Sequence, residues 1–229
     1  MPRERVTLEP AWLLARRPYR ETSALLELLT AEHGRVGLVA RGASGARSKL
    51  RGMLQMFQPL LVSWTASGDL GTLTGVESAG RGMELAGERV FFGWYVNELL
   101  LRLLERHAPQ PEVHAAYGTV VAALAGEGAE TALRRFEVTL LEALGYGLPL
   151  EGVFDPSARY RWDPEQGVQP GGGGREVSGA ALLALRSGQF EAPDTRREVQ
   201  ALLRTAIDRR LDGRELKARR LLREMRQRS

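Results

Sequence analysis

The stretch Arg35-Val-Gly-Leu-Val-Ala-Arg41 decides the fold predicted for the first eighty residues. Val36, Leu38 and Ala40 occupy the even-numbered positions, and the odd-numbered positions begin and end with an arginine. Successive side chains of a strand point to opposite faces, so this alternation is typical of a β-strand with one face turned to a core. The stretch therefore predicts a strand, whose partners must lie nearby in the chain.

Segments of similar length surround this strand on both sides. An apolar run precedes it at residues 11–15, and alternating or apolar segments follow it at residues 59–65 and 70–76. Residues 23–30 carry four leucines, and their period alone fits a helix or a strand. About five short strands with a turn every ten to fifteen residues favour a small β-barrel.

After residues 80–87 the apolar residues take the period of an α-helix. Helices are predicted at residues 88–106, with Trp94 among the apolar positions, and at 111–125, 130–144, 178–186, 194–211 and 214–226. Ser178 and Asp194 are the predicted N-caps. An irregular region rich in proline and glycine lies at about 148–176. The predicted class is α+β, with a barrel domain at 1–80 and an all-helical domain at 81–229.

Composition narrows the classes of function. There is no cysteine, which excludes disulfides, thiolate metal sites and a cysteine nucleophile. We see no apolar run long enough for a signal peptide or a membrane helix, so the expected location is the cytoplasm. Residues 1–51 hold ten Lys/Arg against five Asp/Glu, and residues 204–229 hold ten against four, around an acidic middle. Clustered arginine favours a polyanion partner, although an arginine-rich protein without such a partner is the alternative.

No constellation of catalytic residues stands out. His33, His107 and His114 are the only histidines, and none is spaced with another histidine or a carboxylate as a metal-ligand pair. The glycine run at residues 171–174 lacks the Lys-Ser/Thr of a phosphate-binding loop and follows no predicted strand. We therefore expect a protein that is not an enzyme and that uses no metal or other cofactor.

The strongest local signal lies in the loop Arg41-Gly-Ala-Ser-Gly-Ala-Arg-Ser-Lys-Leu-Arg51. It has four cations, no carboxylate and small residues between them. Small residues let a backbone approach closely, and the cations can contact phosphates. Loops of small barrels of the OB type commonly carry oligonucleotide contacts. The alternative is a mobile loop exposed to water, which composition alone does not reject.

Several motifs in the right order resemble the RecO family. They are Arg17-Pro-Tyr-Arg-Glu-Thr-Ser23, Thr30-Ala-Glu-His-Gly-Arg-Val-Gly-Leu-Val-Ala-Arg-Gly-Ala43, residues 47–61, Tyr95-Val-Asn-Glu-Leu-Leu100, Leu133-Arg-Arg-Phe-Glu-Val-Thr-Leu-Leu141, Leu144-Gly-Tyr-Gly147 and Leu216-Lys-Ala-Arg-Arg-Leu-Leu222. Each motif is weak by itself, but together they cover nearly the whole chain. Many members of the family carry four zinc-binding cysteines after the Leu-Gly-Tyr-Gly motif. Here there are none, so the chain resembles the zinc-less members typical of Gram-negative bacteria, with a remnant hairpin expected around Asp155, Tyr160, Arg161 and Trp162.

The resemblance implies an N-terminal OB-fold followed by a helical domain. It implies a recombination mediator in DNA repair that binds single- and double-stranded DNA, anneals complementary strands, and with RecR loads RecA on DNA coated by the single-stranded DNA-binding protein, SSB. It also implies a pocket for the acidic, apolar C-terminal tail of SSB. Such a tail needs a cation and an apolar slot. Arg134 is our candidate for the cation and Tyr117 for the slot, although Arg134 and Arg135 also fit a helix face exposed to water.

The density of basic residues on the predicted barrel suggests a surface for DNA. Its candidates are Arg16, Arg17, Arg20, Arg35, Arg41, Arg47, Lys49 and Arg51. The basic C-terminal segment, residues 214–228, is a second candidate surface for DNA or for a protein partner. We expect no sequence-specific reading, because phosphate contacts carry no base information, and an association with the nucleoid. The alternative function is that of an OB-fold RNA-binding protein.

Overall fold

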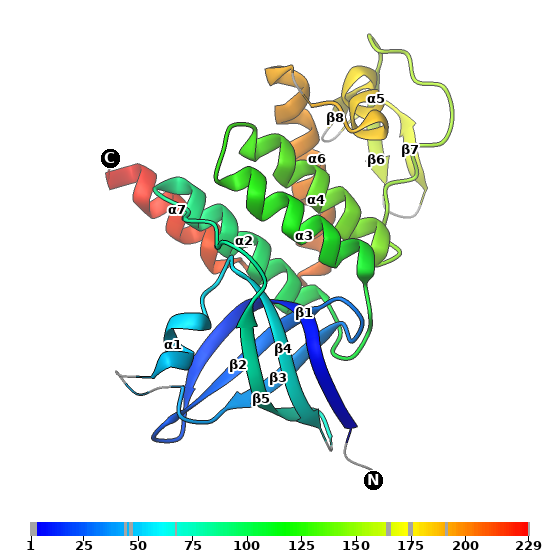
Figure 1. Ribbon diagram of the computed structural model, residues 1–229. Coiled ribbons are helices and arrows are strands. Elements are labelled where there is room, and N and C mark those ends of the chain that lie inside the picture. Colours follow the sequence, from blue (N-terminus) through cyan, green and yellow to red (C-terminus); the bar gives the residue numbers. More distant parts are fainter. Residues whose placement is uncertain are drawn as a thin grey trace. The chain divides into compact units, whose positions relative to one another are not determined.

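The computed structural model describes residues 4–43, 45, 48–66, 68–163, 166–173, 176–190 and 192–228. The chain forms two compact units (Figure 1). Unit 1 comprises residues 1–126 and 216–229, and unit 2 comprises residues 127–215. This division differs from the predicted division at residue 80, because the first two long helices and the last helix group with the barrel.

Five strands of unit 1 form a closed barrel in the order β1-β2-β3-β5-β4. The strands are β1 (Glu4–Tyr19), β2 (Ser23–Thr30), β3 (Arg35–Ala40), β4 (Pro59–Ala66) and β5 (Leu70–Ser78). All neighbours are antiparallel except β3 and β5, which pair in parallel with Leu38 opposite Gly71. A five-stranded closed barrel of this kind fits the predicted OB-fold.

The strand β1 takes part in two pairings because it is long and bent. Its first half pairs with β4 and its second half with β2, and the register shifts between Val6 and Glu9 and again between Leu13 and Ala15. Leu8, in the first irregularity, has a φ of 53° and donates its N–H to Ser63 Oγ at 3.0 Å. Such bulges increase the local twist and help to close a barrel.

Alternating apolar residues fill the barrel. Val36, Leu38 and Ala40 of β3 are all buried in the same core cluster as Leu26 and Leu28 of β2, as the alternation of residues 35–41 predicts. The ambiguous segment 23–30 is therefore a strand. Gly71 is needed in this core because a Cβ there would lie 2.7 Å from Leu38 Cδ2, so the glycine lets β3 and β5 pack closely.

Four helices complete unit 1: α1 (Lys49–Met53), α2 (Glu88–Leu103), α3 (Pro111–Leu124) and α7 (Lys217–Arg228). The helix α1 begins inside the stretch 41–51 that the sequence predicts as loop and ends two residues after it. Helix α2 contacts the barrel through Asn97, whose Nδ2 donates to the carbonyl of Leu14 at 3.0 Å. Helix α7 lies beside α2. Arg226 of α7 donates two hydrogen bonds of 2.7 Å to the carboxylate of Glu88 in α2.

Unit 2 combines α4 (Ala129–Ala143), α5 (Gly179–Ser187) and α6 (Pro193–Arg210) with a small sheet. Its strands β6 (Arg159–Asp163), β7 (Gly167–Pro170) and β8 (Glu176–Ser178) lie in the order β7-β6-β8. A hairpin is present where one was expected, since Tyr160, Arg161 and Trp162 belong to β6 and pair with β7, while Asp155 lies before the strand.

The two predicted N-caps have different outcomes. Ser178 caps α5, with its hydroxyl oxygen accepting from the N–H of Ala181 at 3.1 Å. The cap predicted at Asp194 is wrong: α6 begins one residue earlier at Pro193, Ala192 is its N-cap, and Asp194 lies in the first turn. Proline suits the first position of a helix because its missing N–H would have no intrahelical partner there. In the described part of the chain, no helix combines the length and the apolar character needed to cross a membrane.

Candidate nucleic-acid interface

The basic stretch at residues 41–51 follows β3 and is attached to β1 by Arg16. Nη2 of Arg16 donates to the carbonyl of Ala43 at 2.5 Å, and Nη1 donates to the carbonyl of Arg51 at 3.4 Å. Burial, and after it the nearby guanidinium of Arg51, lower the pKa of Arg16. Arginine remains charged at neutral pH despite such a shift, so two like charges are held close together. A pair of this kind is favourable for an anion.

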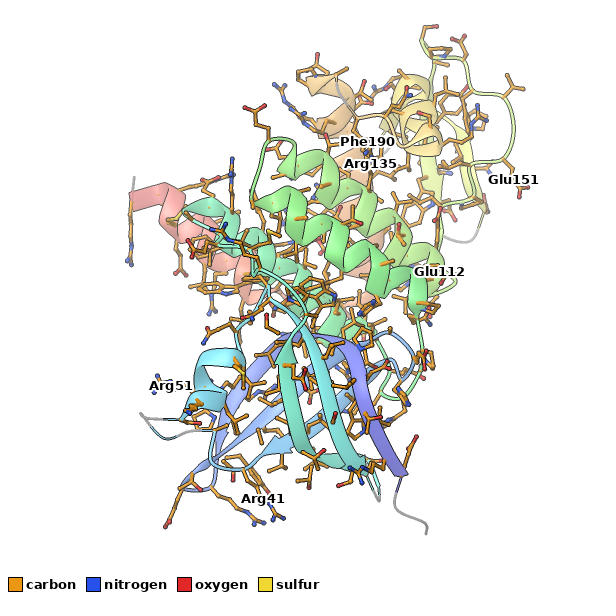
Figure 2. The ribbon with its side chains drawn as sticks, in the orientation of Figure 1. Arg41, Arg51, Glu112, Arg135, Glu151 and Phe190 are labelled. Carbon is orange, nitrogen blue, oxygen red and sulfur yellow. The ribbon has the colours of Figure 1, made fainter. Side chains whose placement is uncertain are left out.

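Further cations of the predicted surface are exposed. Arg17, Arg20, Arg41, Lys49 and Arg51 all face water. Arg41 and Arg51 extend away from the ribbon of the barrel and of α1 (Figure 2). The strand register explains part of the grouping: Tyr19 lies opposite Ser23, and Ala24 lies opposite Ala40, so the turn that holds Arg20 and the residue after β3 share one end of the barrel.

Arg35 does not belong to this group. It lies opposite Leu29 at the other end of β3, five residue steps from Ala40, a distance of about 17 Å. Its Nη1 donates to the carbonyl of Leu101 in α2, and its Nε lies 4.0 Å from Glu27 Oε2. Burial lowers the pKa of Arg35, while Glu27 opposes that shift. The side chain connects the barrel to α2, and we leave it out of the surface proposed below.

One predicted member of the surface, Arg47, lies outside the described residues. So does Gly174, the last residue of the glycine run. Of that run, Gly172 donates its N–H to Glu176 Oε1 at 3.0 Å.

The candidate cation for an acidic tail, Arg134, lies in α4 and is only 7% exposed. Its Nη2 donates to Glu137 Oε1 at 2.9 Å, one helical turn away, and its Nε is buried without a partner among the described residues. Arg135, its neighbour, points to the surface and donates to the carbonyl of Gly188 at 3.0 Å (Figure 2). Arg134 thus has a buried donor still available, but its charge is already compensated.

Tyr117, the candidate for the apolar slot, is fully buried in α3 of unit 1. Its hydroxyl donates to Asn97 Oδ1 at 2.7 Å, and its ring packs on Trp12 with 5.2 Å between centroids. The side chain therefore has no exposed surface with which to line a slot, and its visible role is in the core. The helical period of residues 111–125 indicates an inward position for it as readily as a binding role.

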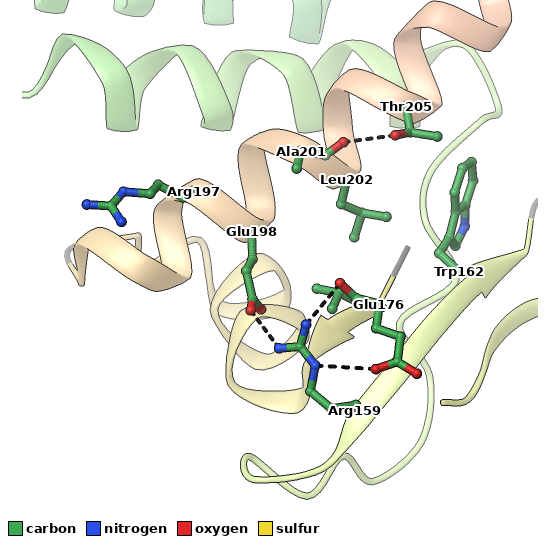
Figure 3. Close-up of a pocket in the computed structure, with 9 residues that line it drawn as sticks. Arg159, Trp162, Glu176, Arg197, Glu198, Ala201, Leu202 and Thr205 are labelled. Carbon is green, nitrogen blue, oxygen red and sulfur yellow. Dashed lines mark hydrogen bonds and ion pairs between the residues drawn. The ribbon is translucent and has the colours of Figure 1, made fainter. Parts of the chain in front are cut away.

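A pocket in unit 2 contains residues for which the sequence predicts no site (Figure 3). Arg159 of β6 donates to Glu198 Oε1 of α6 at 2.6 Å and lies 3.7 Å from Glu176 Oε2 of β8. Burial raises the pKa of Glu198, but hydrogen bonds from Ser178 and Arg159 outweigh it, and the pKa is lowered. These ion pairs connect the small sheet to α6, and their charges compensate one another. The partners lie far apart in the sequence, so no local sequence pattern predicts this network.

The histidines lie apart from the basic surface. His33 lies 3.5 Å from Glu9 Oε1 and stacks edge-on against Trp64, whereas burial lowers the pKa of His114 in α3. Within the part of the chain that the structure describes, no group of three or more His, Asp or Glu residues is arranged to hold a metal ion.

Comparison with known proteins finds family matches for both halves of the chain. The family model "Recombination protein O N terminal" matches residues 5–80, and "Recombination protein O C terminal" matches residues 85–220. A DNA repair protein RecO from Methylococcus capsulatus is 46% identical over 96% of this chain and 94% of its own. Those of Halorhodospira halophila and Coxiella burnetii are 46% and 41% identical, over 95% and 96% of this chain and 97% and 99% of theirs. The chain belongs to the RecO family.

Proposed function

We propose that this chain is a recombination mediator of DNA repair that binds DNA without sequence specificity and anneals complementary strands. Membership of the RecO family supports the role in repair and recombination. The observation that carries the proposal is the cluster around Arg16, whose guanidinium donates to the carbonyls of Ala43 and Arg51 and so attaches the basic stretch to the barrel. Arg17, Arg20, Arg41 and Lys49 extend this cluster, and we call the six residues together the barrel surface.

The barrel surface suits phosphates better than bases. Arginine and lysine neutralise phosphates and release the counterions condensed on DNA, which gives affinity for any sequence. Such contacts fix position but carry no sequence information. Binding of both single and double strands follows, because both present phosphates. Annealing follows as well, since a protein that neutralises two strands reduces the repulsion between them.

The test of the barrel surface is the variant Arg47→Glu/Lys49→Glu/Arg51→Glu, which changes two of its residues together with Arg47 of the same basic stretch. We expect weaker binding to single strands and duplexes of every sequence, and a plot of log affinity against log salt that is flatter by about 2.7 for duplex DNA if each cation contacts one phosphate. The measurement is fluorescence anisotropy with labelled oligonucleotides at several salt concentrations.

A matched control separates this contact from net charge. Arg197→Glu/Arg204→Glu/Arg209→Glu changes the charge by the same amount on α6 of unit 2. This variant should bind DNA with nearly the wild-type salt slope. Equal affinities for wild type and the variant at residues 47, 49 and 51 would remove the barrel surface from the proposal. Tighter binding to structured RNA, with no annealing of DNA, would favour the alternative of an OB-fold RNA-binding protein.

We further propose that the chain acts with RecR to load RecA on DNA coated by SSB, and that it contacts the acidic tail of SSB through Arg134. The buried Nε of Arg134, which has no partner among the described residues, supports the second point. A tail carboxylate has to compete with Glu137 for this guanidinium. Arg134→Ala should weaken binding of a fluorescein-labelled SSB tail peptide, whereas the control Arg135→Ala should not. Equal effects of the two substitutions would contradict the assignment.

The proposed mechanism contains no covalent step, and the chain acts by binding alone. Its purified form should leave labelled DNA uncut in the presence of magnesium. Cleavage that copurifies with the protein would contradict this part of the proposal.

A further inference from the structure

Unit 1 has a groove that shares one described residue, Arg17, with the barrel surface. Arg17 of β1 lines it together with Trp94, Glu98 and Leu101 of α2 and Lys217 and Leu221 of α7. Its volume is about 590 Å³, within the range of sites for small ligands. The sequence places Trp94 among the apolar positions of a packed helix, yet the residue is 36% exposed.

The walls of the groove are fixed by contacts between α2 and α7. Glu98 Oε2 accepts from the backbone N–H of Ala218 at 3.0 Å, at the start of α7. Arg219 donates to the hydroxyl of Tyr95 at 3.1 Å, and Arg226 closes the other end on Glu88. The two helices are therefore held together along their length, and the groove between them is preformed.

The charges inside the groove are unequal. Glu98 is its carboxylate, and this group is engaged on both oxygens, with Arg102 at 3.2 Å on Oε1 and Ala218 on Oε2. Among the described residues, neither Arg17 nor Lys217 forms an ion pair with a carboxylate. Two cations, one on β1 and one on α7, are thus available in the groove, and an anionic ligand would neutralise them.

Trp94 presents an exposed aromatic surface in the same groove as these cations. An edge-to-face contact with Phe91 holds the indole of Trp94 in place, with the ring centroids 5.4 Å apart and the ring planes at 82°. Leu101 and Leu221 add apolar surface on the two helices. An exposed indole flanked by cations is the combination that proteins use for single-stranded nucleic acid, with bases stacked on the ring and phosphates on the cations.

We propose that this groove binds a short segment of single-stranded DNA, with a base stacked on Trp94 and the flanking phosphates on Arg17 and Lys217. The inference rests on the proposed function, since it extends the DNA path from the barrel surface onto α2 and α7. Arg17 belongs to the barrel surface as well as to the groove, and it follows Arg16 directly on β1. In Figure 1 both α1 and α7 lie on the left of unit 1.

The charge of α7 favours a polyanion over a short acidic peptide. The helix carries six Lys/Arg against one Glu, so it keeps a net positive charge beyond the groove although Arg220 pairs with Glu224 and Arg226 with Glu88. A nucleic-acid strand can follow such a path, whereas a peptide that ends in the groove would use only its first turn. Duplex DNA keeps its bases stacked on one another, and the indole cannot reach a base face there. The groove therefore adds affinity for single strands alone.

The first experiment compares Trp94→Ala with wild type in binding to a labelled oligo-dT and to a duplex of equal length. We expect the affinity for oligo-dT to fall between about fivefold and about a hundredfold, because stacking of one base contributes that much. Affinity for the duplex should not change. Tyr146→Ala is the matched control, since Tyr146 is another exposed aromatic residue, 43% exposed, whose ring lies under Arg210 and outside the groove.

The second experiment tests the phosphates with Arg17→Glu/Lys217→Glu. The plot of log affinity for oligo-dT against log salt should be flatter by about 1.4 if each cation contacts one phosphate of a single strand. Photochemical crosslinking of wild type to an oligonucleotide that contains 5-iodouracil should label the peptide that carries Trp94. Crosslinking needs no substitution, so it tests the contact even if a variant folds poorly.

The outcomes separate this inference from the proposed function. If Trp94→Ala binds oligo-dT like wild type while the loop variant at residues 47, 49 and 51 loses binding, the groove is not a DNA site and the barrel surface remains. If neither wild type nor any variant binds DNA, the proposed function fails first. If Trp94→Ala loses binding of the labelled SSB tail peptide but keeps oligo-dT, the groove is a peptide site and the inference is overturned.

Discussion

Asn97 connects three elements of unit 1 through buried hydrogen bonds. Its Nδ2 donates to Leu14 of β1, and its Oδ1 accepts from the hydroxyl of Tyr117 in α3 at 2.7 Å. Burial raises the pKa of Tyr117, so its phenol keeps the proton that it donates. The arrangement depends on a donor and an acceptor that water cannot replace inside the core.

Replacement of this donor gives a prediction at the residue scale. Tyr117→Phe should lower the free energy of unfolding by about 1–3 kcal/mol, because it leaves the buried amide oxygen of Asn97 without its donor. Urea denaturation measures the effect. Tyr19→Phe is the control, since Tyr19 is half-buried on β1 and its ring remains; it should change stability much less. Equal stability of Tyr117→Phe and wild type would show that the hydrogen bond contributes nothing.

The half-buried His114 gives a prediction about pH. Burial lowers its pKa in the folded protein from 6.5, while Glu9 opposes the shift. The unfolded chain therefore takes up a proton at this histidine at a higher pH than the folded chain does. Stability must decrease as the pH falls below about 6.5, and above that value the residue contributes no pH dependence.

The variant His114→Gln should remove this part of the pH dependence. Between pH 7.5 and pH 5.5, its urea midpoint should fall less than that of wild type. His107→Asn serves as the control, because His107 is exposed and has a φ of 59°, which asparagine tolerates. It should follow wild type. A larger fall for His114→Gln than for wild type would contradict the assigned direction.

At the scale of elements, α2 packs closely enough on the chain before β4 to require a glycine. A Cβ on Gly93 would lie 2.6 Å from Phe57 Cζ and 2.8 Å from Leu85 Cδ1. Alanine would improve helix propensity by about 1 kcal/mol, but overpacking of a filled core costs about 1–3 kcal/mol. Phe57 is only 7% exposed and has a φ of 64°, so its ring has little room to move.

Gly93→Ala should therefore destabilise unit 1, with a lower urea midpoint than wild type. Gly118→Ala, in α3, is the comparison: its Cβ would lie 3.3 Å from Trp12 Cζ2, a mild approach that partly offsets the gain in propensity. It should cost less than Gly93→Ala. A Gly93→Ala variant more stable than wild type would show that the close approach can relax.

The cap of α5 gives a second prediction at this scale. Ser178→Ala should lower the stability of unit 2 by about 1 kcal/mol, because the N–H of Ala181 loses its acceptor. Ser187→Ala, at the other end of the helix, removes a hydroxyl that donates to the carbonyl of Ala184 and should cost less. Hydrogen exchange at the first turn of α5 measures the loss. Unchanged exchange in Ser178→Ala would contradict the role of the cap.

Local patterns predicted the elements better than their boundaries. The alternation at residues 35–41 predicts β3, and the helical period predicts all six long helices within a few residues. The same patterns do not extend β1 to sixteen residues, since Pro10, Pro18 and the charges around them conceal a strand that pairs with two neighbours. They also do not decide whether residues 23–30 form a helix or a strand, because a buried strand and a buried helix are both rich in leucine.

The candidate site shows where sequence patterns stop. Arg41 and Arg51 share one basic stretch, so their grouping was predictable, whereas the contact of Arg16 with this stretch spans 35 positions. The position of Arg35 depends on strand register, which places it at the other end of β3. Tyr117 lies inside the core because of its packing against Trp12. The groove at Trp94 joins residues more than a hundred positions apart in the chain, and only the docking of α7 on α2 brings them together.

For the whole molecule, two basic ends of the chain meet in one compact unit. Residues 1–51 and the helix α7 both belong to unit 1, so the positive charge at the two ends of the sequence is combined there. Such a concentration of charge steers a polyanion to this unit. The acidic middle of the chain contributes much of unit 2. DNA affinity should therefore depend on charges of unit 1 and hardly on those of unit 2.

Annealing of complementary fluorescent oligonucleotides coated with SSB tests the central claim most directly, with full-length SSB or SSB that lacks its acidic tail. The account predicts that wild type anneals the coated strands, that the variant at residues 47, 49 and 51 does not, and that removal of the SSB tail slows annealing. Wild type that anneals neither coated nor bare strands would contradict the proposal that this chain is a recombination mediator.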